Sequence, residues 1–239
     1  MVNWIDTSEV RALLLAGGQS SRMGTDKALL ARQQKNTSVQ YQGSQQLQQQ
    51  PSQRQTQLNY MLELLSQLGL KEVLLSRNPH QQDDQLHNSA LPRISDNFTD
   101  CGPLAGIEAA MRYSLRHEDP GKALLIVPVD LPLLTERTLR YLLSQGQARN
   151  QACYFRDHFL PLFLPLCPEQ HGLMVQRLQQ ASSSGKQRGL SIKALCHEIE
   201  ADALIAPHSQ SLINANTPQQ WQQAGFHLRP NLTLASKAG

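Results

Sequence analysis

The sequence predicts an α/β fold with a mostly parallel central sheet and helices on both faces. Short apolar runs alternate with segments whose apolar residues recur at helical spacing, a pattern typical of parallel sheets covered by helices. The runs at 13–15 and 123–129 are continuously apolar, as expected for strands buried on both faces. The 239 residues, of which 40% are hydrophobic, suit one globular unit, so we expect a single domain over 1–239.

The first half of the chain repeats a strand and helix pattern. A buried strand at 9–16 leads into a glycine-containing loop, and apolar residues at helical spacing over 58–68 predict a helix that ends at Gly69. The cycle then recurs, with strands expected at 71–76, 93–95 and 123–129 and helices expected to begin near Pro103 and Thr135. In such a sheet, ligands bind beyond the carboxyl ends of the strands.

The second half is less regular. Strands are expected at 152–155 and 159–166, and the second contains Pro161 and Pro165. Proline cannot donate a ladder hydrogen bond, so this strand should be an edge strand or an irregular one. Helices at 168–180 and 191–197, an apolar segment at 211–213 and a helix opening at Pro218 complete the prediction.

Two segments lack the signals of a packed core. Twelve of the 25 residues at 33–57 are glutamine, with almost no apolar periodicity, which predicts a flexible insertion. The tail from about residue 226 has no clear assignment.

Composition excludes several classes of function. The formal charge is +3 and the 22 Lys and Arg residues are scattered, so we expect no nucleic-acid partner. No apolar stretch is long enough to span a bilayer, which predicts a cytoplasmic protein without membrane contact. The four cysteines have neither disulfide-framework nor zinc-site spacing, so we expect reduced thiols: Cys101, Cys153, Cys167 and Cys196.

The most informative segment is residues 15–27, which leaves the first buried strand. It supplies three glycines, two serines, Arg22 and Lys27. Glycines let backbone N–H groups approach phosphate oxygens, and the two cations offset the charge of a triphosphate. A Walker A loop does not fit because Gly24 is not followed by Lys and Ser or Thr, and the GxGxxG fingerprint is absent. An ordinary glycine-rich turn is the alternative.

The string LAGGxSxRMGxDK at 15–27 resembles the signature of the molybdenum cofactor guanylyltransferase family and its cytidylyltransferase relatives. These families share a Rossmann-like fold of the nucleotide-diphospho-sugar transferase type. The resemblance continues through four further blocks in the same order: ISD at 94–96, GPLAGI at 102–107, VPVDLP at 127–132 and NANTP at 214–218. It covers most of the chain outside the glutamine-rich segment and the tail.

The resemblance implies a set of site residues. The catalytic residues would be Arg22, Lys27 and Asp130, with Asp130 also the magnesium ligand. Asn214 and Asn216 would lie on the acceptor side. The nucleotide would be bound by Leu15, Ala16, Gly17, Gly18, Lys27, Ser76, Asp96 and Asp130.

The position of Asp130 in the sequence also supports a role as a metal ligand independently of the resemblance. It follows the apolar strand at 123–129, so its carboxylate should stand at the edge of the sheet where ligands bind. Magnesium binds through one or two carboxylates plus substrate phosphates, so one well-placed aspartate is enough. The alternative is a helix N-cap, and the two roles are compatible.

The other implied residues have simpler alternatives. Asp96 could cap a turn, and Asn214 and Asn216 could be turn residues before Pro218. The glycines at 102 and 106 could serve helix packing instead of approach to a ligand. The family often has asparagine where Ser76 stands, which leaves base selectivity open. His158 is separated from Pro161 by two residues, unlike the family pattern, and is not assigned to the site.

The resemblance implies that the chain transfers GMP from GTP to a molybdenum-molybdopterin cofactor and releases pyrophosphate, with Mg²⁺ as cofactor. Its partners would be these substrates, other cofactor-biosynthesis proteins and recipient apo-enzymes. A cytidylyltransferase of the same fold is one alternative, and a nucleotide-binding protein without turnover is another. Arg22, Lys27 and Asp130 together argue against the latter, because binding alone needs no metal-ligating aspartate.

Overall fold

The computed structural model describes residues 6–17, 26–32, 55–77, 91–98, 101–184 and 191–224. The strands are β1 (Val10–Leu15), β2 (Glu72–Ser76), β3 (Arg93–Ile94), β4 (Ala123–Pro128), β5 (Cys153–Phe155), β6 (His158–Pro165) and β7 (Asp202–Leu204). The helices are α1 (Gln57–Ser66), α2 (Pro103–Arg116), α3 (Glu136–Arg149), α4 (Pro168–Ser184), α5 (Ile192–Glu198) and α6 (Pro218–Gln223). Three 3₁₀ turns are η1 (Thr7–Glu9), η2 (Lys27–Leu29) and η3 (Ser209–Leu212).

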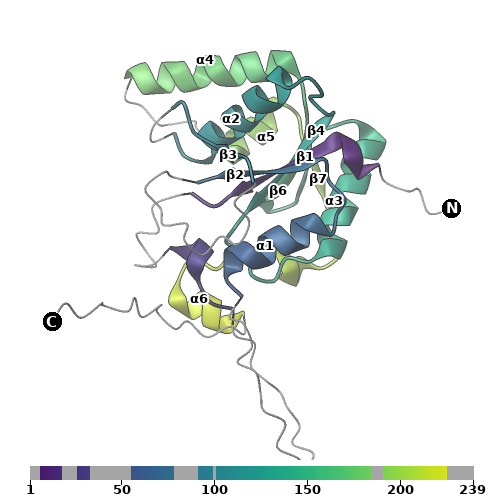
Figure 1. Ribbon diagram of the computed structural model, residues 1–239, viewed down its shortest axis with the longest axis vertical. Helices are drawn as coiled ribbons and strands as arrows, with labels where there is room; N and C mark the ends of the chain where they lie inside the picture. Colours follow the sequence, from purple (N-terminus) through teal and green to yellow (C-terminus); the bar gives the residue numbers. More distant parts are fainter. Residues whose placement is uncertain are drawn as a thin grey trace, which may run out of the picture.

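The described strands form one seven-stranded sheet in the order β3-β2-β1-β4-β6-β5-β7. Figure 1 shows this sheet between α2 and α4 on one side and α1 on the other. Strands β1 to β4 are parallel to their neighbours among themselves, and β5 is parallel to β7. Among the strands of the described residues, only β6 runs antiparallel to both strands beside it. The mostly parallel sheet predicted from the sequence is therefore confirmed.

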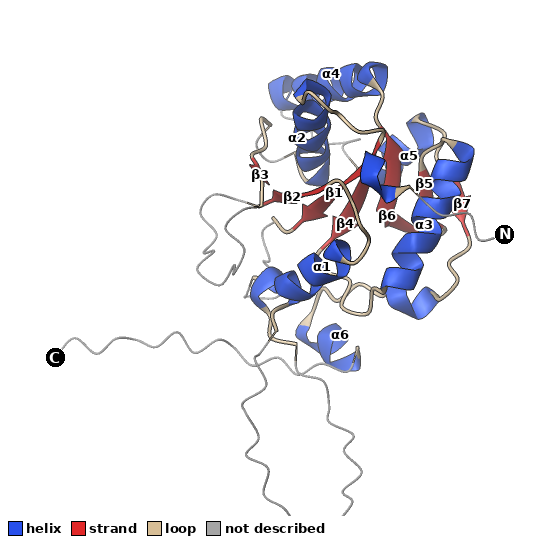
Figure 2. Ribbon diagram, turned by 45° about the vertical axis from the view of Figure 1, so that its right-hand side comes forward, coloured by secondary structure: helices blue, strands red, loops and turns tan. Residues whose placement is uncertain are grey.

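Helices cover both faces of this sheet (Figure 2). One apolar cluster joins α1 and α3 to the sheet, and a second joins α2, α4 and α5 to the opposite face. Strand β1 contributes to both, because successive side chains of a strand point to opposite faces. Ala12 and Leu14 belong to the first cluster and Leu13 to the second, and all three are fully buried. The continuous apolar run therefore has the structure expected for it.

Local signals begin the helices where the sequence predicts. The hydroxyl of Thr135 accepts a hydrogen bond from the N–H of Thr138 and caps α3. Gly102 is the N-cap of helix α2, at a φ of 63°, and Pro103 follows in the first turn. The positive φ favours glycine at this position, and Pro103 needs no hydrogen-bond partner there.

The proline-containing strand differs from one of its two predicted forms. β6 is irregular, with a register shift between Tyr154 and Phe155 of its neighbour β5, but it is not an edge strand. Its ladder with β4 runs from Leu162 to Pro165, so Pro161 lies outside those pairs and Pro165 stands at the strand's end. Both prolines therefore occupy positions where a missing N–H is tolerated.

The described chain resumes at Gln55, so the last three residues of the glutamine-rich segment have a defined place. Thr56 caps α1, and Gln57 is fully buried, with its side-chain amide donating to the carbonyl of Val129 at 2.9 Å. Residues 33–54 and the tail from 226 lie outside the described residues, so their predicted flexibility stays a prediction.

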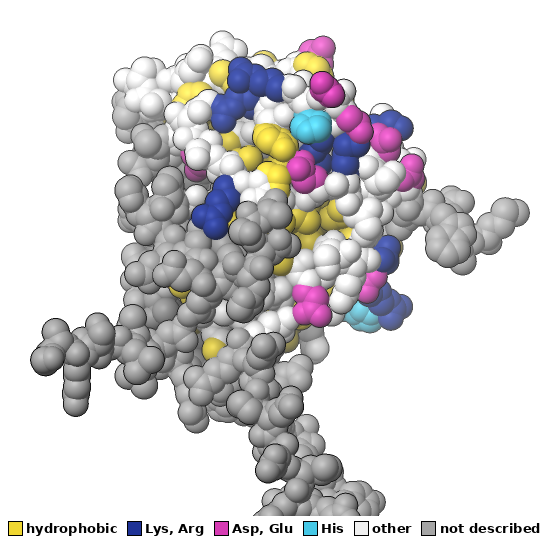
Figure 3. Space-filling model, in the orientation of Figure 1, with side chains coloured by type: hydrophobic (Ala, Val, Ile, Leu, Met, Phe, Trp, Pro, Cys, Tyr) yellow, Lys and Arg dark blue, Asp and Glu magenta, His cyan; other side chains and the backbone are white. Residues whose placement is uncertain are grey.

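Further expectations concern thiols, membranes and charge. The four cysteines, all of them in the described part of the chain, form no disulfide with one another, as predicted. Burial raises the pKa of Cys153 to about 11 and of Cys196 to about 12. Within the described part of the chain, no helix has the length and apolar character needed to cross a membrane. On the face seen in Figure 3, basic and acidic side chains of the described residues are interspersed.

Candidate active site

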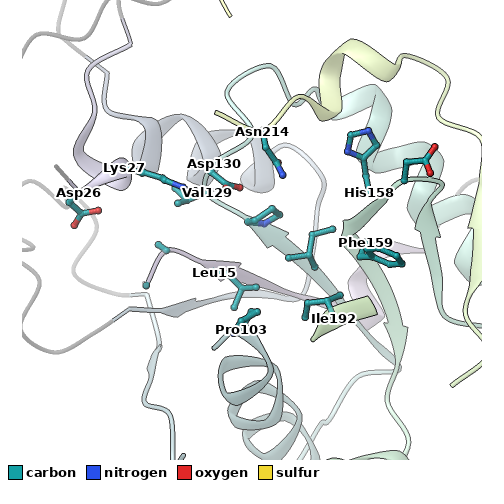
Figure 4. Close-up of a pocket in the computed structure, with 15 residues that line it drawn as sticks. Leu15, Asp26, Lys27, Pro103, Val129, Asp130, His158, Phe159, Ile192 and Asn214 are labelled. Atoms are coloured by element: carbon teal, nitrogen blue, oxygen red, sulfur yellow. Dashed lines mark hydrogen bonds and ion pairs between the residues drawn. The ribbon is translucent and has the colours of Figure 1, made fainter. Parts of the chain in front are cut away.

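A cleft of about 460 Å³ lies beyond the carboxyl ends of β1 and β4. Its floor comes from the residues that end these strands, and its walls come from η2, the start of α2, the start of β6 and the start of α5 (Figure 4). This is the edge at which parallel sheets bind ligands. The lining residues are Leu15, Ala16, Gly17, Asp26, Lys27, Pro103, Pro128, Val129, Asp130, Asp157, His158, Phe159, Leu160, Ile192 and Asn214.

Lys27 and Asp130 face each other on one wall of this cleft. The Lys27 ammonium lies 3.4 Å from Oδ2 of Asp130 and also donates a hydrogen bond to Oδ1 of Asn216. Both charged side chains remain partly accessible, at 20% and 22% exposure. An ion pair that is partly open to a cleft keeps one cation and one carboxylate available to a ligand.

The asparagine segment is fixed to the same wall by its central residue. The N–H of Ala215 donates to the carbonyl of Asp130 at 3.0 Å, and Ala215 is buried with Leu30 and Trp221. On either side of this anchor, Asn214 lines the cleft and Asn216 contacts Lys27. The segment at 214–216 therefore belongs to the site through both the backbone and the side chains.

Asp26 stands at the start of η2, directly before Lys27. Its Oδ1 accepts from the N–H of Ala28 at 3.0 Å and caps the turn, while Oδ2 accepts from Arg77 at 2.7 Å. The Arg77 guanidinium is 1% exposed and also donates to the carbonyl of Ala16 at 3.3 Å. Arg77 follows β2 directly, so it links the ends of two strands to the residue preceding Lys27.

Two expected nucleotide ligands do not line the cleft, although the carbonyl of Ser76 accepts a hydrogen bond from the N–H of Ala16, which does. Ser76 ends β2 and is 7% exposed, and it packs against Gly106, where an added Cβ would come within 2.8 Å of its hydroxyl oxygen. Gly106 thus allows the close approach of α2 to the sheet. Asp96 follows β3 on the exposed surface, and partial desolvation together with the nearby charge of Glu108 raises the pKa of its carboxyl group.

The wall opposite Lys27 is mixed in character (Figure 4). Asp157 occupies the turn between β5 and β6 at a φ of 68°, and His158 follows it. The ring of Phe159 stacks on Tyr154 at a centroid distance of 5.1 Å, and Ile192 adds an apolar side chain from α5. This wall offers a flat aromatic surface beside a histidine and a carboxylate.

Most of the described residues expected from the sequence meet in this cleft. Leu15, Ala16, Gly17, Lys27, Asp130 and Asn214 line it, and Asn216 contacts Lys27. Gly18 and Arg22 lie outside the described residues, and the roles assigned to Ser76 and Asp96 stay predictions.

Sequence reasoning did not single out Asp26, Arg77, Asp157 or the apolar wall, and it left His158 unassigned. A signal for Arg77 exists, because a charged residue directly after a buried strand reaches the ligand-binding edge. No local signal marks Ile192 or Phe159, because folding alone brings them to the cleft.

The oxygen donors of the cleft suit a hard divalent cation. Asp130 and Asn214 both line the cleft, and Mg²⁺ accepts one or two carboxylates when phosphates and water complete its shell. Among the described residues, no three His, Cys, Asp or Glu side chains gather to hold a metal ion by themselves. A cation at Asp130 would therefore depend on a bound phosphate for further ligands.

Comparisons with known proteins find relatives that match most of the chain. A family model described as a MobA-like NTP transferase domain matches residues 12–199. The chain is 31% identical to a protein of Xanthomonas euvesicatoria named molybdenum cofactor guanylyltransferase, over 92% of this chain and 95% of the relative. It is 26% identical to a Vibrio cholerae protein of the same name, over 92% and 94% of the two chains.

The solved structure of 4-diphosphocytidyl-2C-methyl-D-erythritolsynthase from Anaerococcus prevotii matches the fold. Its TM-score is 0.58 at 10% identity, over 92% of this chain and 96% of the other. This likeness supports the fold class expected from the sequence.

Proposed function

The chain belongs to the MobA-like NTP transferase family, and we propose that it transfers GMP from GTP to a molybdopterin-type acceptor and releases pyrophosphate. Two relatives that it matches over most of their length are named molybdenum cofactor guanylyltransferase. The observation that carries the proposal is the arrangement of Lys27, Asp130 and Asn216 at the carboxyl ends of β1 and β4, beside an open cleft.

The nucleotide would lie across the carboxyl end of β1. The backbone at Leu15, Ala16 and Gly17 lines the cleft there, and Lys27 supplies a cation for the triphosphate. Gly18 and Arg22 would extend this phosphate site, and Ser76 and Asp96 would act at its far side, as the family pattern implies. Asp130 would hold Mg²⁺, with Asn214 and Asn216 toward the acceptor.

The reaction needs positioning and charge stabilisation more than acid or base chemistry. An oxygen of the acceptor's terminal phosphate attacks the α-phosphorus of GTP, and the bond from that phosphorus to the oxygen bridging the α- and β-phosphates breaks. The electron pair leaves with pyrophosphate. The attacking phosphate is already ionised near neutral pH, so no general base is required. When bound, Mg²⁺ would neutralise charge on the phosphate oxygens.

Lys27 would stabilise the negative charge that grows on the triphosphate during this step. Its ammonium is already held by Asp130 and Asn216, so little reorganisation is needed when substrate binds. Asp130 serves both the ammonium and the proposed cation, which keeps the two positive charges close together. The protein thereby offers a preorganised positive site at the reacting phosphates.

The opposite wall suits the acceptor. The aromatic ring of Phe159 and the side chain of Ile192 offer apolar contact for a ring system, while His158 offers a hydrogen-bonding group. The product would then pass to recipient apo-enzymes, with other cofactor-biosynthesis proteins as further partners. A cytoplasmic location is part of the same proposal.

The test is pyrophosphate release by the purified chain with Mg²⁺ and a molybdopterin acceptor, offering GTP, CTP and ATP separately. We expect release with GTP only. Release with CTP alone would move the assignment to a cytidylyltransferase, and silence with all three despite nucleotide binding would favour a protein without turnover. Omission of the acceptor controls for simple GTP hydrolysis.

A further inference from the structure

Arg77 touches both ends of the segment that joins β1 to η2. Its guanidinium donates to the carbonyl of Ala16, where the chain leaves β1, and to the carboxylate of Asp26, where the described chain resumes. The side chain is 1% exposed and does not line the cleft, whereas both of its partners do. Arg77 therefore contacts the site through Ala16 and Asp26 and does not itself line the cleft.

The contact with Asp26 also bears on Lys27. Asp26 caps η2 through Ala28, so the orientation of the first turn of η2 depends on where Arg77 holds this carboxylate. Lys27 is the next residue and reaches across to Asp130 and Asn216. The backbone that carries the catalytic ammonium is thus tied to β2 on one side, through Arg77, and to β4 on the other, through Asp130.

We propose that Arg77 is a positioning residue that fixes the ends of the β1–η2 connection and thereby sets the place of the Lys27 ammonium. Its fork of N–H donors suits this role, because it contacts a carbonyl and a carboxylate at once, which a lysine ammonium does with less geometric definition. The proposal rests on the proposed function and adds a residue that does not contact the nucleotide.

A simpler role must be separated from this one. Asp26 lines the cleft, and without Arg77 its carboxylate would have no ion pair and would repel a triphosphate. Arg77 would therefore also support activity if its only role were to neutralise that charge. The two roles predict different activities for one double variant. Replacing both side chains, Arg77→Met with Asp26→Asn, removes the repulsion as well as the link, while the asparagine retains its capping oxygen.

Arg11 supplies the matched control. It is likewise 1% exposed, pairs with Glu72 at 3.0 Å, and donates to the main-chain carbonyls of Asp119 and Pro120. These contacts lie at the amino edge of the same sheet, away from the cleft. Arg11→Met therefore removes an equally buried arginine and its ion pair with Glu72 without touching the site.

The first experiment measures kcat and KM for GTP in the wild-type enzyme and these variants. Arg77→Met should lower kcat by about 10- to 100-fold, the cost of displacing a catalytic group, while KM changes less than about threefold. Arg77→Lys should recover part of the loss, and Arg11→Met should leave both constants within about twofold. A normal kcat in Arg77→Met overturns the proposal.

The double variant decides the role. If Arg77 positions Lys27 through Asp26, Arg77→Met adds less than about threefold in an Asp26→Asn background, and the double variant stays as slow as the worse single variant. Recovery of near wild-type activity would instead show that Arg77 only neutralises charge. Losses that multiply would show that Arg77 acts independently of Asp26. Either result overturns the proposal.

A second readout does not need turnover. The amides of Ala28, Leu29 and Leu30 are hydrogen-bonded within η2, to Asp26 and Lys27. Hydrogen exchange at these amides should quicken by about tenfold or more in Arg77→Met and stay within about twofold in Arg11→Met. Unchanged exchange in Arg77→Met overturns the proposal. If the wild-type chain releases no pyrophosphate, the proposed function is wrong. The hydrogen-exchange rates of the η2 amides still test whether Arg77 holds η2 in place.

Discussion

The two edges of the sheet carry the same types of charged residue, but at the amino edge these residues hold the fold together and at the carboxyl edge they line a cleft. At the amino edge, Arg11 meets Glu72 and two carbonyls, and Lys71 pairs with Asp119. At the carboxyl edge, Lys27 and Asp130 meet across 3.4 Å on the wall of a cleft.

The pKa values of two aspartates follow this contrast. The hydrogen bond from Lys71 lowers the pKa of Asp119 at the amino edge. Desolvation and the charge of Glu108 raise the pKa of Asp96 at the carboxyl edge. Charged side chains that are held in ion pairs at the amino edge stabilise the fold. Charged side chains at the carboxyl edge that stay accessible, or that lie near a like charge, are available for chemistry.

The largest expected effect comes from Asp130→Asn. This change keeps the shape of the side chain but removes the carboxylate that would hold the metal ion, so kcat/KM should fall by at least about 1,000-fold. Asp119→Asn, the corresponding change at the amino edge, should leave kcat/KM within about twofold. Pyrophosphate release measures both. Equal losses in the two variants would contradict the division between the edges.

Lys27→Met should cost somewhat less, about 100-fold in kcat/KM, because it removes one electrostatic contact with the triphosphate and leaves the proposed metal site in place. Lys71→Met is the matched change at the amino edge and should leave turnover unchanged. Measuring GTP saturation in parallel shows whether the loss lies in kcat. A Lys27→Met enzyme with wild-type kcat/KM would remove Lys27 from the mechanism.

Arg11→Met should act on stability instead. It leaves Glu72 without its ion pair and two carbonyls without a donor, which should lower the free energy of unfolding by about 2–4 kcal/mol. Urea denaturation gives this value from the shift in midpoint. The folded variant should turn over GTP normally. A stability close to wild type would show that the amino-edge contacts contribute little.

The smallest effect separates two aspartates by the sign of their pH dependence. Because the folded-state pKa of Asp96 is raised, its carboxylate opposes folding at pH values above that pKa. Asp96→Asn should therefore raise the unfolding temperature at about pH 7, by no more than about 2 °C, and have no effect near about pH 3.

Asp119 has a lowered pKa, so its stabilising contribution is complete at neutral pH and is lost as the pH falls through that pKa. Asp119→Asn should lower the unfolding temperature at about pH 7. Thermal unfolding at several pH values compares the two variants. Shifts of the same sign at neutral pH would show that the carboxyl edge carries no unfavourable charge at Asp96.

Most of the fold follows from local patterns. The continuous apolar run of β1, the Thr135 cap of α3 and the Gly102-Pro103 start of α2 each depend on neighbours in sequence, so they are visible without a structure. The place of β6 inside the sheet cannot be seen in the sequence. Its prolines predict an interrupted ladder of hydrogen bonds, but they do not indicate which strands lie beside it.

The sequence by itself determined the fold class, the family resemblance and the residues at the carboxyl edge, such as Lys27 and Asp130, because motif residues follow apolar strands in a readable order. Only the tertiary structure decided which of them meet. It joined Asn216 to Lys27 and Arg77 to Asp26, and it packed Ser76 against Gly106, behind the residues that line the cleft. Such contacts link residues far apart in the chain, and crossovers and side-chain packing determine them.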